Sequence, residues 1–312
     1  MHMDTPSLNA YIIIATKGRA AITFELLTWL QSQTLPATHV VVVGSEARDV
    51  TDLDTHPSVL AGKASVVVAK HAGSSHQRNV GVDVAKKFGL LGEAPSFAVF
   101  MDDDFRPAKT WLEAAQKNFQ AQPDVVGITG HVLADGAQGT PLTTDDARVY
   151  LSGRKPPEPH WASGATQRPM ESLFGCNMAF RDTAVRQCVF DEALPLYGWQ
   201  EDQDYSSQAS RLGRNIYSPD CIGVHLGSKS GRTSGLRFGY SQIANPLYLI
   251  KKGTMSRRKA YKFIAKHLAA NTVKSLLRHP TVDYPGRLKG NVRALTDLVR
   301  GRCDPRRILE FV

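Results

Sequence analysis

Short apolar runs alternate with helical patterns over residues 10–119, and this alternation restricts the possible folds more than any other feature. Each run is a nearly continuous stretch of apolar side chains, which is typical of a strand buried on both faces. The four runs are residues 10–15, 39–43, 65–69 and 96–101. Amphipathic helical spacing follows at residues 20–33, 76–88 and 107–119, and we expect Pro107 to begin the last helix. The alternation predicts an α/β fold with a mixed, mostly parallel sheet and helices on both faces.

Three adjacent aspartates, Asp102, Asp103 and Asp104, follow the fourth apolar run directly. Ligands of parallel sheets bind beyond the carboxyl ends of the strands, and Thr16 and Glu46 follow the first two runs in the same way. Neighbouring carboxylates repel one another unless a cation lies between them, and Mn²⁺ or Mg²⁺ accepts such oxygen ligands. Capping of the next helix is the alternative, but it accounts for only one aspartate. We therefore predict a divalent cation site that a bound diphosphate completes.

A second acidic cluster, Glu201, Asp202 and Asp204, lies at the start of a helix predicted for residues 201–212. The helix dipole stabilises acidic residues in a first turn, so the cluster has a purely structural explanation. Alternatively, an aspartate at this position points into a cleft as a general base, and the neighbouring Trp199 stacks on a sugar. From this segment alone, both interpretations remain open.

One histidine and several basic residues lie where they can contact a bound diphosphate. His225 ends a short predicted strand, and we predict a further metal ligand there beside Asp104, although a lone histidine is more often structural. Lys229 and Arg232, in the Gly- and Ser-rich segment that follows, would fold over the diphosphate and neutralise the leaving group. A solvated linker is the alternative for this segment. Arg78 opens a helix, which suits a phosphate, a nucleobase edge or a plain surface position.

The positive charge is concentrated at the C-terminal end of the chain. The net charge is +9, but residues 229–312 contain 19 Lys and Arg against 4 Asp and Glu. Such asymmetry points to an anionic partner. A basic amphipathic helix is predicted for residues 257–278, with an apolar face formed by Phe263, Ile264, Leu268 and Leu276. We predict that residues 257–278 contact an anionic membrane surface, and packing of this helix on the rest of the chain is the alternative.

The 312 residues suffice for one large domain or two modest ones. We predict a first domain over residues 1–228, with two parts at 8–130 and 131–228, followed by a mostly helical extension over 229–312. Residues 135–170 are rich in Gly, Pro, Ser and Thr, so we expect a long functional or mobile loop. The four cysteines show no Cys-x-x-Cys spacing, so we expect neither disulfides nor a zinc site. No apolar run reaches the ~20 residues that span a bilayer, and we recognise no signal peptide. We therefore expect a cytoplasmic protein.

Together, these segments resemble family 2 glycosyltransferases of the GT-A fold over about residues 8–228. The resemblance rests on Ile-Ala-Thr-Lys-Gly-Arg (14–19), Gln33-Thr34, Ser-His-Gln-Arg-Asn-Val-Gly (75–81), Phe-Met-Asp-Asp-Asp-Phe (100–105), Gly-Cys-Asn-Met-Ala-Phe-Arg (175–181), Glu-Asp-Gln-Asp-Tyr (201–205) and His225. It implies a Rossmann-like, metal-dependent enzyme that transfers a sugar from a nucleotide diphosphate with inversion. It also implies that residues 1–228 form the catalytic domain, with nucleotide-sugar binding in 8–130 and the acceptor part in 131–228. The basic tail is similar to extensions of bacterial exopolysaccharide glycosyltransferases, which commonly use lipid-linked oligosaccharides. We therefore expect a glycan or lipid-linked acceptor, and an enzyme peripheral at the inner face of the cytoplasmic membrane.

The resemblance also implies a role for each matching residue. Asp102 and Asp104 form an Asp-x-Asp pair in which Asp104 is the direct metal ligand, and Asp202 is the catalytic base with Glu201 beside it. Many members read uracil with an acidic residue at the end of the second strand. This chain has no Asp at that place, so Glu46 would substitute for it, and a UDP-sugar is favoured. The remaining donor-side residues are Thr16, Arg19, Arg78, Asp103, Lys229 and Arg232. The residues expected to border the donor sugar and the acceptor are Gly175, Asn177, Trp199 and Asp204.

Two other function classes are compatible with parts of the sequence. A sugar-1-phosphate nucleotidyltransferase also uses a parallel sheet and a carboxylate-held metal, but it needs a Gly-rich phosphate loop after the first strand. Thr16-Lys17-Gly18-Arg19 is a poor version of that loop. A nucleic-acid-binding protein would use the basic tail, which lacks a recognisable nucleic-acid motif. We therefore expect no nucleic-acid partner.

Overall fold

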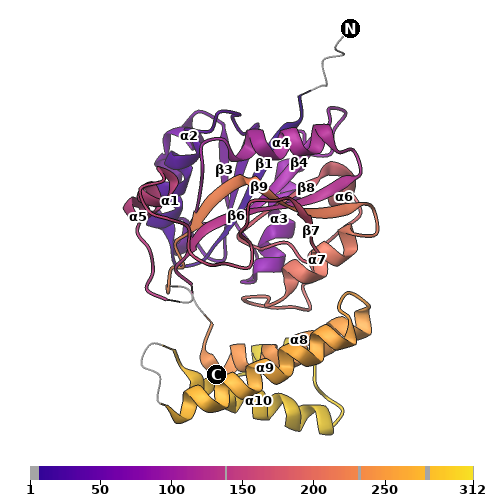
Figure 1. Cartoon of the computed structure of the whole chain (residues 1–312). Helices are drawn as coiled ribbons and strands as arrows, with labels where there is room; N and C mark the ends of the chain where they lie inside the picture. The colour runs from indigo at the N-terminus through magenta and orange to yellow at the C-terminus, as the bar shows by residue number, and fades with distance from the viewer. Residues whose placement is uncertain (1–6, 138, 231–232, 278–281, 312) are drawn as a thin grey trace. The chain divides into compact units, whose positions relative to one another are not determined.

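The computed structural model describes residues 7–137, 139–230, 233–277 and 282–311, and the chain forms two compact units (Figure 1). The sheet unit contains Met1–Ala72, Gln77–Val189 and Gln208–Gly231. The helical unit contains Gly73–His76, Phe190–Ser207 and Arg232–Val312. The acidic cluster at 201–204 thus belongs to the same unit as the C-terminal helices. The predicted domain boundary after residue 228 stays a prediction.

Nine strands in the described part of the chain form one sheet. They are β1 (Asn9–Thr16), β2 (His39–Gly44), β3 (Ala64–Val68), β4 (Ser96–Asp102), β5 (Phe105–Pro107), β6 (Val125–Asp135), β7 (Arg168–Pro169), β8 (Asn177–Arg181) and β9 (Arg214–His225). Their order is β3-β2-β1-β4-β8-β6-β9-β5, with β7 paired to β9. The first four strands pair in parallel, whereas β8 is antiparallel to both β4 and β6. The predicted α/β fold with a mixed sheet is confirmed.

Helices cover both faces of this sheet. On one face, Ile12 and Ile14 of β1 join a cluster with residues of α1 (Ala20–Leu30) and α4 (Trp111–Ala121). On the other face, Ile13 meets α3 (Ser74–Lys86) at Gly81, where a Cβ would overlap the isoleucine side chain. Glycine therefore permits α3 to lie directly on the strand. The shorter helices are η1 (Ala47–Val50), η2 (Leu53–Thr55), α2 (Pro57–Leu60), α5 (Thr144–Leu151), α6 (Asp182–Val185) and α7 (Glu201–Ala209).

The segment after the aspartates differs from the expectation. Pro107 does not begin a helix but ends β5, because residues 105–107 pair with β9, and α4 begins at Trp111. The two short strands expected at 216–217 and 222–225 are parts of one strand, β9. The pairing of β9 with β6 shifts register between Gly130 and His131, which interrupts the alternation that a regular strand shows in sequence.

The loop expected at residues 135–170 contains a helix, α5. Its start is a capping box, in which Thr143 Oγ1 accepts from the Asp146 N–H at 3.0 Å and the Asp146 carboxylate accepts from the Thr143 N–H at 2.8 Å. Thr-x-x-Asp is a recognisable signal of a helix start, so the sequence contained the information that the composition of the loop obscured.

Three long helices make up most of the helical unit: α8 (Gly235–Lys252), α9 (Arg257–Leu276) and α10 (Tyr284–Val299), followed by η3 (Pro305–Glu310). The helix predicted at 257–278 is confirmed as α9. The backbones of α8 and α10 approach closely, since a Cβ on Gly239 or Gly290 would overlap a carbonyl of the other helix. None of the helices in the described ranges is long and apolar enough to cross a membrane.

Candidate functional site

Asp102, Asp104 and His225 converge at one edge of the sheet. Asp102 ends β4 and Asp104 lies in the turn before β5, while His225 ends β9. The antiparallel pairing of β5 with β9 sets Phe105 opposite His225, and the Leu226 N–H donates to the Asp104 carbonyl at 2.8 Å. One ligand atom from each of the three side chains lies within 4.8 Å of the others. The structure thus brings together the three residues predicted as metal ligands.

The surroundings of Asp104 suit a bound cation. Its side chain is 2% exposed, its Oδ2 accepts from the Ser228 N–H at 2.8 Å, and its Oδ1 lies 3.2 Å from His225 Nε2. That Oδ1 is buried and has no hydrogen-bond partner among the described residues. Burial alone would raise the pKa of Asp104, but His225, Arg19 and the Ser228 N–H together lower it. An ionised carboxylate and a second carboxylate are ligands that suit Mn²⁺ or Mg²⁺, and the His225 ring can join them when metal binding displaces its Nε2 proton.

Asp103 is not part of the group formed by Asp102, Asp104 and His225. It instead links the ends of β4 and β1. It is 2% exposed, and its carboxylate accepts from Thr16 Oγ1 at 2.7 Å and from Arg19 Nη1 at 2.8 Å. Burial raises its pKa to about 6, although Arg19 and Thr16 favour the charged form. Thr16 and Arg19, predicted as donor-side residues, therefore lie directly against the aspartate turn.

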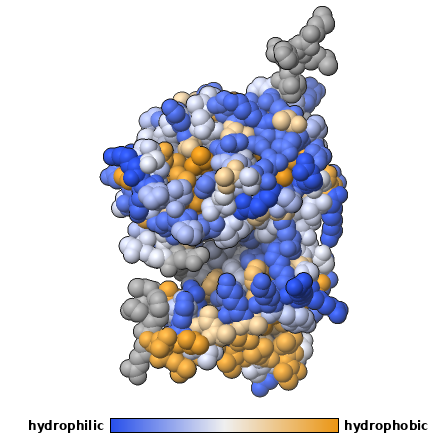
Figure 2. Space-filling view, in the orientation of Figure 1, coloured by the Kyte–Doolittle hydropathy of each residue, from blue (hydrophilic) through white to orange (hydrophobic). Residues whose placement is uncertain are grey.

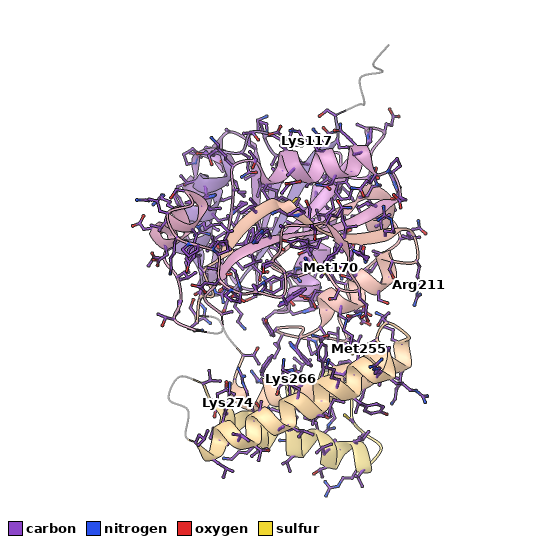
Figure 3. The ribbon with its side chains drawn as sticks, viewed as in Figure 1. Lys117, Met170, Arg211, Met255, Lys266 and Lys274 are labelled. Carbon is purple, nitrogen blue, oxygen red and sulfur yellow. The ribbon has the colours of Figure 1, made fainter. Side chains whose placement is uncertain are left out.

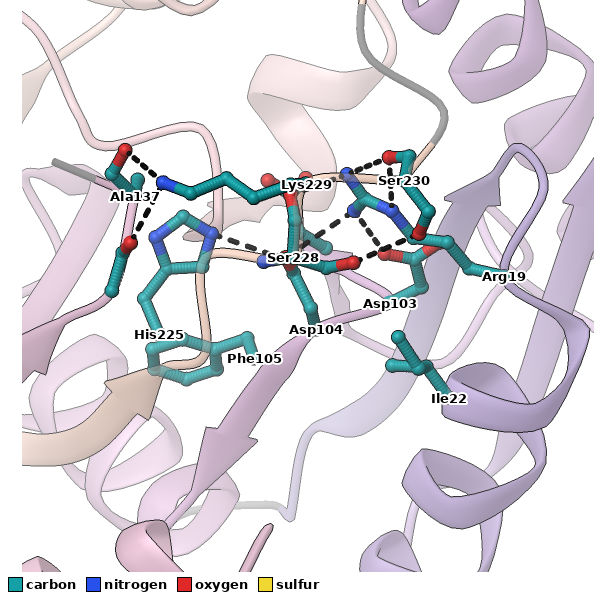
Figure 4. A network of polar contacts seen from close by, with 12 residues as sticks. Arg19, Ile22, Asp103, Asp104, Phe105, Ala137, His225, Ser228, Lys229 and Ser230 are labelled. Carbon is teal, nitrogen blue, oxygen red and sulfur yellow. Dashed lines mark hydrogen bonds and ion pairs between the residues drawn. The ribbon is translucent and has the colours of Figure 1, made fainter. Parts of the chain in front are cut away.

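The segment 226–230, which we call the strap, lies over this turn (Figure 4). Arg19 donates to the carbonyls of Ser228 at 3.2 Å and Ser230 at 2.9 Å, so the same guanidinium holds both the strap and Asp103. Lys229 Nζ donates to the carbonyls of Gly136 at 3.2 Å and Ala137 at 2.9 Å. The predicted diphosphate contact of Lys229 would thus require it to change partners. Arg232 lies outside the described residues.

Asp135 is a site residue that the sequence did not indicate. The register of β6 and β9 sets it opposite His225, and its Oδ1 lies 2.8 Å from His225 Nδ1. It also accepts from the Ala137 N–H at 2.8 Å, and its Oδ2 lies 3.4 Å from His160 Nε2. Burial acts to lower the pKa of His225, but Asp104 and Asp135 on its two sides raise it well above its usual range. The contact between the Asp135 carboxylate and Nδ1 fixes the orientation of the His225 ring, so that Nε2 faces Asp104.

Arg78 and its neighbours border Asp102. Arg78 is 4% exposed, and its Nη2 donates to Asp102 Oδ1 at 3.1 Å and to the Gly175 carbonyl at 3.0 Å. This excludes the plain surface position considered for Arg78. Burial raises the pKa of Asp102, whereas Arg78 opposes the increase.

Asn177 lies close by, because the antiparallel pairing of β4 and β8 sets it opposite Met101. Its Oδ1 accepts from Thr129 Oγ1 at 2.7 Å, while its buried Nδ2 finds no hydrogen-bond partner in the described ranges. Buried amide donors are rarely left without an acceptor, so this group is suited to contact a bound substrate.

The end of β2 is organised by another unanticipated residue, Asp49. Its buried carboxylate accepts from the N–H groups of Gly18 at 2.7 Å, Ser45 at 2.9 Å and Glu46 at 3.0 Å. Asp49 therefore joins the loops that follow β1 and β2. The Glu46 carboxylate itself is 45% exposed and lies beside Arg48 at 2.6 Å. This position leaves Glu46 accessible for the predicted nucleobase contact.

In the helical unit, the acidic cluster divides into residues with different surroundings. Asp204 is fully buried, and its two oxygens accept from Thr254 Oγ1 at 2.6 Å and Lys252 Nζ at 2.7 Å. These contacts connect α7 to the end of α8, so they favour a structural role over the predicted acceptor contact. Asp202, by contrast, is only half-buried, and its Oδ1 accepts from the Gln203 N–H at 2.8 Å.

Trp199 also has a structural environment. Its ring lies against Phe238 and His267, with centroids 6.1 and 5.1 Å away, and its carbonyl accepts from Asn245 Nδ2 at 2.7 Å. The sugar-stacking role predicted for Trp199 stays a prediction. Between Trp199 and the acidic cluster, Gln200 has a left-handed backbone with φ 74°. Such strained non-glycine residues concentrate at functional sites.

No family model matches the sequence, and a search of curated proteins finds no match. Solved structures are similar, however. Residues 1–349 of S. aureus TarS align with a TM-score of 0.58 and 18% identity, covering 98% of this chain and 83% of that one. The complex of the same protein with UDP-GlcNAc gives a TM-score of 0.57 and 18% identity, covering 98% and 84%.

GalNAc-T7 in complex with UDP, GalNAc and Mn²⁺ aligns with a TM-score of 0.54 and 13% identity over 78% of this chain. The chain spans about half of that protein, 51% of its length. At these identities the similarity establishes the fold. The expected GT-A glycosyltransferase fold is therefore confirmed.

Proposed function

We propose that this chain is a metal-dependent, inverting glycosyltransferase of the family 2 type. It would transfer a sugar from a nucleotide-diphosphate sugar, with UDP-sugars favoured, to a hydroxyl of a glycan or lipid-linked oligosaccharide in bacterial surface polysaccharide synthesis. The observation that carries the proposal is the convergence of Asp102, Asp104 and His225 at the sheet edge of a GT-A fold. The similar structures support the donor class, since TarS was solved with UDP-GlcNAc and GalNAc-T7 with UDP, GalNAc and Mn²⁺.

Asp102, Asp104 and His225 would hold the divalent cation, Mn²⁺ or Mg²⁺. When bound, the ion supplies positive charge that stabilises a departing diphosphate. The chain prepares this site in advance. Asp135 holds the His225 ring, and the Arg19–Asp103 contact of 2.8 Å fixes the turn that carries Asp104. A preorganised site of this kind needs little rearrangement during the reaction.

The donor nucleotide would bind beside this turn. Thr16 and Arg19 lie at the end of β1, Glu46 follows β2, and Arg78 lies against Asp102. Arg19 and Lys229 would exchange their present carbonyl partners for phosphate oxygens, because a charged acceptor makes the stronger hydrogen bond. The buried Asn177 amide would donate to a hydroxyl of the donor sugar or the acceptor.

Asp202 would act as the general base. It takes the proton from the acceptor hydroxyl while that oxygen forms a bond to the anomeric carbon. The bond from the anomeric carbon to the diphosphate oxygen breaks on the opposite side, so the configuration inverts. A positioned base of this kind contributes roughly 10²–10⁴-fold to the rate. The half-buried position of Asp202 in the first turn of α7, next to the strained Gln200, supports this assignment over Asp204.

The basic extension supports the proposed acceptor class and the proposed location of the enzyme. Residues 229–312 contain 19 Lys and Arg but only 4 Asp and Glu, and this excess of positive charge favours contact with an anionic surface. We propose that the extension, including residues 257–278, brings the enzyme to the inner face of the cytoplasmic membrane, where a lipid-linked acceptor is available. Retention of activity toward a soluble glycan, with none toward a lipid-linked one, would argue against this acceptor.

A thermal-shift screen tests the proposed donor. UDP, GDP, CDP and dTDP are each added to the protein with and without Mn²⁺, and we expect UDP to raise the melting temperature only when Mn²⁺ is present. Asp104→Ala should remove this shift. Asp145→Ala provides a matched control, because that carboxylate is 86% exposed and lies on α5. A nucleotide shift that is independent of the metal, or absent for all four nucleotides, would refute the proposal.

A further inference from the structure

The apolar face predicted for α9 is mostly occupied inside the helical unit. Ile264 and Leu268 pack against a cluster formed by α8, α10 and η3, and Phe263 packs against a second cluster that includes Met255. These three side chains are therefore engaged in holding the helices together. Only Leu276 of the predicted face remains strongly exposed, at 79%. A membrane contact through α9 as originally predicted would lack most of its apolar residues.

Other apolar side chains of the helical unit are exposed instead. At the C-terminal end of α9 they are Val273, Leu276 and Leu277, and on α10 they are Val292, Leu295, Leu298 and Val299. On α10 the spacing of 292, 295 and 299 puts them on one side of the helix. Val299 is 90% exposed and Val292 is 55% exposed. Figure 2 shows hydrophobic residues gathered over the helical unit, where α9 and α10 lie. Scattered exposed leucines need no explanation, but a contiguous group of this kind does.

Basic side chains flank this apolar group. Lys289, Arg293 and Arg300 are exposed on α10 and follow one another at helical spacing beside the apolar residues. The exposed side of α9 carries Arg257, Arg258, Lys262 and Lys266, and Lys266 and Lys274 are labelled along this helix in Figure 3.

Acidic residues do not offset this charge. α9 contains none, and the single acidic residue of α10, Asp297, is 1% exposed and bound by Arg302 and Arg307 at 2.7 and 2.8 Å. The surface that combines exposed aliphatic residues with this positive charge is formed by α10 and the C-terminal end of α9. We call it the α9–α10 face.

We propose that the α9–α10 face is an interfacial membrane-binding surface. Its aliphatic side chains would enter the boundary between headgroups and acyl chains, and its lysines and arginines would contact the phosphates of anionic lipids. A helix that lies in the interface needs an apolar side and a basic border, and α10 has both. This inference deepens the proposed membrane location of the enzyme, but binding to lipid requires neither donor nor metal.

Vesicle co-sedimentation of the full chain, without nucleotide or Mn²⁺, tests the proposal. We expect retention on vesicles of phosphatidylcholine with phosphatidylglycerol, little retention on phosphatidylcholine alone, and release at high salt. The triple variant Val292→Ser, Leu295→Ser, Val299→Ser should bind the anionic vesicles at least tenfold more weakly. The matched control is Leu60→Ser, Val68→Ser, Val189→Ser, which removes exposed apolar residues of the sheet unit and should bind like the wild type.

Two further measurements make the outcome decisive. Circular dichroism should show unchanged helix content in the triple variant, and a second variant, Lys289→Gln, Arg293→Gln, Arg300→Gln, should lose anionic binding with the apolar residues intact. Equal retention of wild type and both variants would overturn the proposal, as would a wild type that does not bind. A wild-type dimer that becomes monomeric in the triple variant would show that a second copy covers the face. Because the assay omits nucleotide, its result is independent of the metal-dependent UDP shift.

Discussion

The sheet unit and the helical unit use their charged residues in opposite ways. At the sheet edge, Asp103 and Asp104 are each 2% exposed, and Arg19 lies against both of them. In the helical unit, most of the basic residues of α9 and α10 are exposed, and the one acidic residue of those helices is buried in ion pairs. Buried charges that are fixed by specific partners suit the recognition of one ion or one transition state. Exposed charges suit a diffuse anionic surface. The charges of the sheet unit thus fit the proposed metal site, and those of α9 and α10 fit the proposed membrane-binding surface.

The largest predicted effect separates the two aspartates of α7. Asp202→Asn should reduce transfer by roughly 10²–10⁴-fold, because the variant cannot accept the proton of the acceptor hydroxyl. The UDP and Mn²⁺ thermal shift should remain, since donor binding does not need the base. Asp204→Asn should instead lower the melting temperature, because Lys252 loses one of its two carboxylate partners and keeps only Asp191. Wild-type transfer by Asp202→Asn, measured as release of UDP with acceptor present, would remove this residue from the catalytic role.

The next largest predicted effect concerns Asp135, whose carboxylate contacts His225. Asp135→Ala should weaken Mn²⁺ binding by roughly 10–100-fold, since the His225 ring loses the partner of its Nδ1. Asp135→Asn keeps an acceptor oxygen at that position and should recover part of the affinity. Calorimetric titration with Mn²⁺ measures both, and Asp145→Ala serves again as the exposed carboxylate control. If Asp135→Ala bound Mn²⁺ like the wild type, the contact of Asp135 with His225 would be structural only.

Most of the sheet and part of the candidate site could be predicted from the sequence. The residues that were missed have roles that depend on contacts between distant parts of the chain. The strands β1 to β4 and the proposed metal ligands Asp102 and Asp104 follow from local patterns, since a fully apolar run and an adjacent charge cluster are visible without any partner. Asp135 was missed because its role depends on the pairing of β6 with β9, which joins residues 90 positions apart. Local sequence does not determine such a register, least of all where a bulge interrupts it.

The acidic cluster shows a different limit. Asp202 and Asp204 both lie in the first turn of α7 and have the same intrinsic preference for a helix start. Only the positions of Lys252 and Thr254, about fifty residues later in the chain, distinguish the buried aspartate from the accessible one. What covers the apolar face of α9 could not be predicted for the same reason. Amphipathic spacing indicates that one side of the helix is apolar, but it does not say what covers that side.

A smaller effect concerns the pH dependence of the helical unit. Burial lowers the pKa of His267 to about 4, and the positive charges of Lys266 and Arg287 contribute a smaller part of this decrease. The Nδ1 atom of His267 lies 3.1 Å from the Gln242 amide nitrogen. The unfolded chain therefore binds a proton at higher pH than the folded one. The stability that this neutral ring contributes is present above about pH 6.5 and decreases as the pH falls toward 4.

We expect a loss of at most about 2 kcal/mol between pH 7 and pH 5 from this residue. Urea unfolding at the two pH values measures it, and His267→Gln, which cannot titrate, should show a correspondingly smaller difference. The same pH dependence in both proteins would assign the acid sensitivity to other groups.

The smallest predicted effect concerns α5, the helix within the segment 135–170 that was expected to be a loop. Thr143→Ala removes the capping box of α5 and should destabilise the sheet unit by about 1 kcal/mol. Ser152→Ala, at the other end of the same helix, should have less effect, because the capping box is the stronger of the two local contacts. Chemical denaturation of both variants provides the comparison, and equal stabilities would show that packing rather than the cap determines where α5 begins.

The central claim is that two of three adjacent aspartates, together with His225, form a metal site, while the aspartate between them serves the fold. Titration of Mn²⁺ in the presence of UDP, followed by electron paramagnetic resonance of the free ion, tests it most directly. The account predicts one bound Mn²⁺ per chain in the wild type, an affinity at least roughly tenfold weaker in Asp104→Asn, and an affinity close to wild type in Asp103→Asn. Equal losses in the two variants, or no bound ion in the wild type, would contradict it.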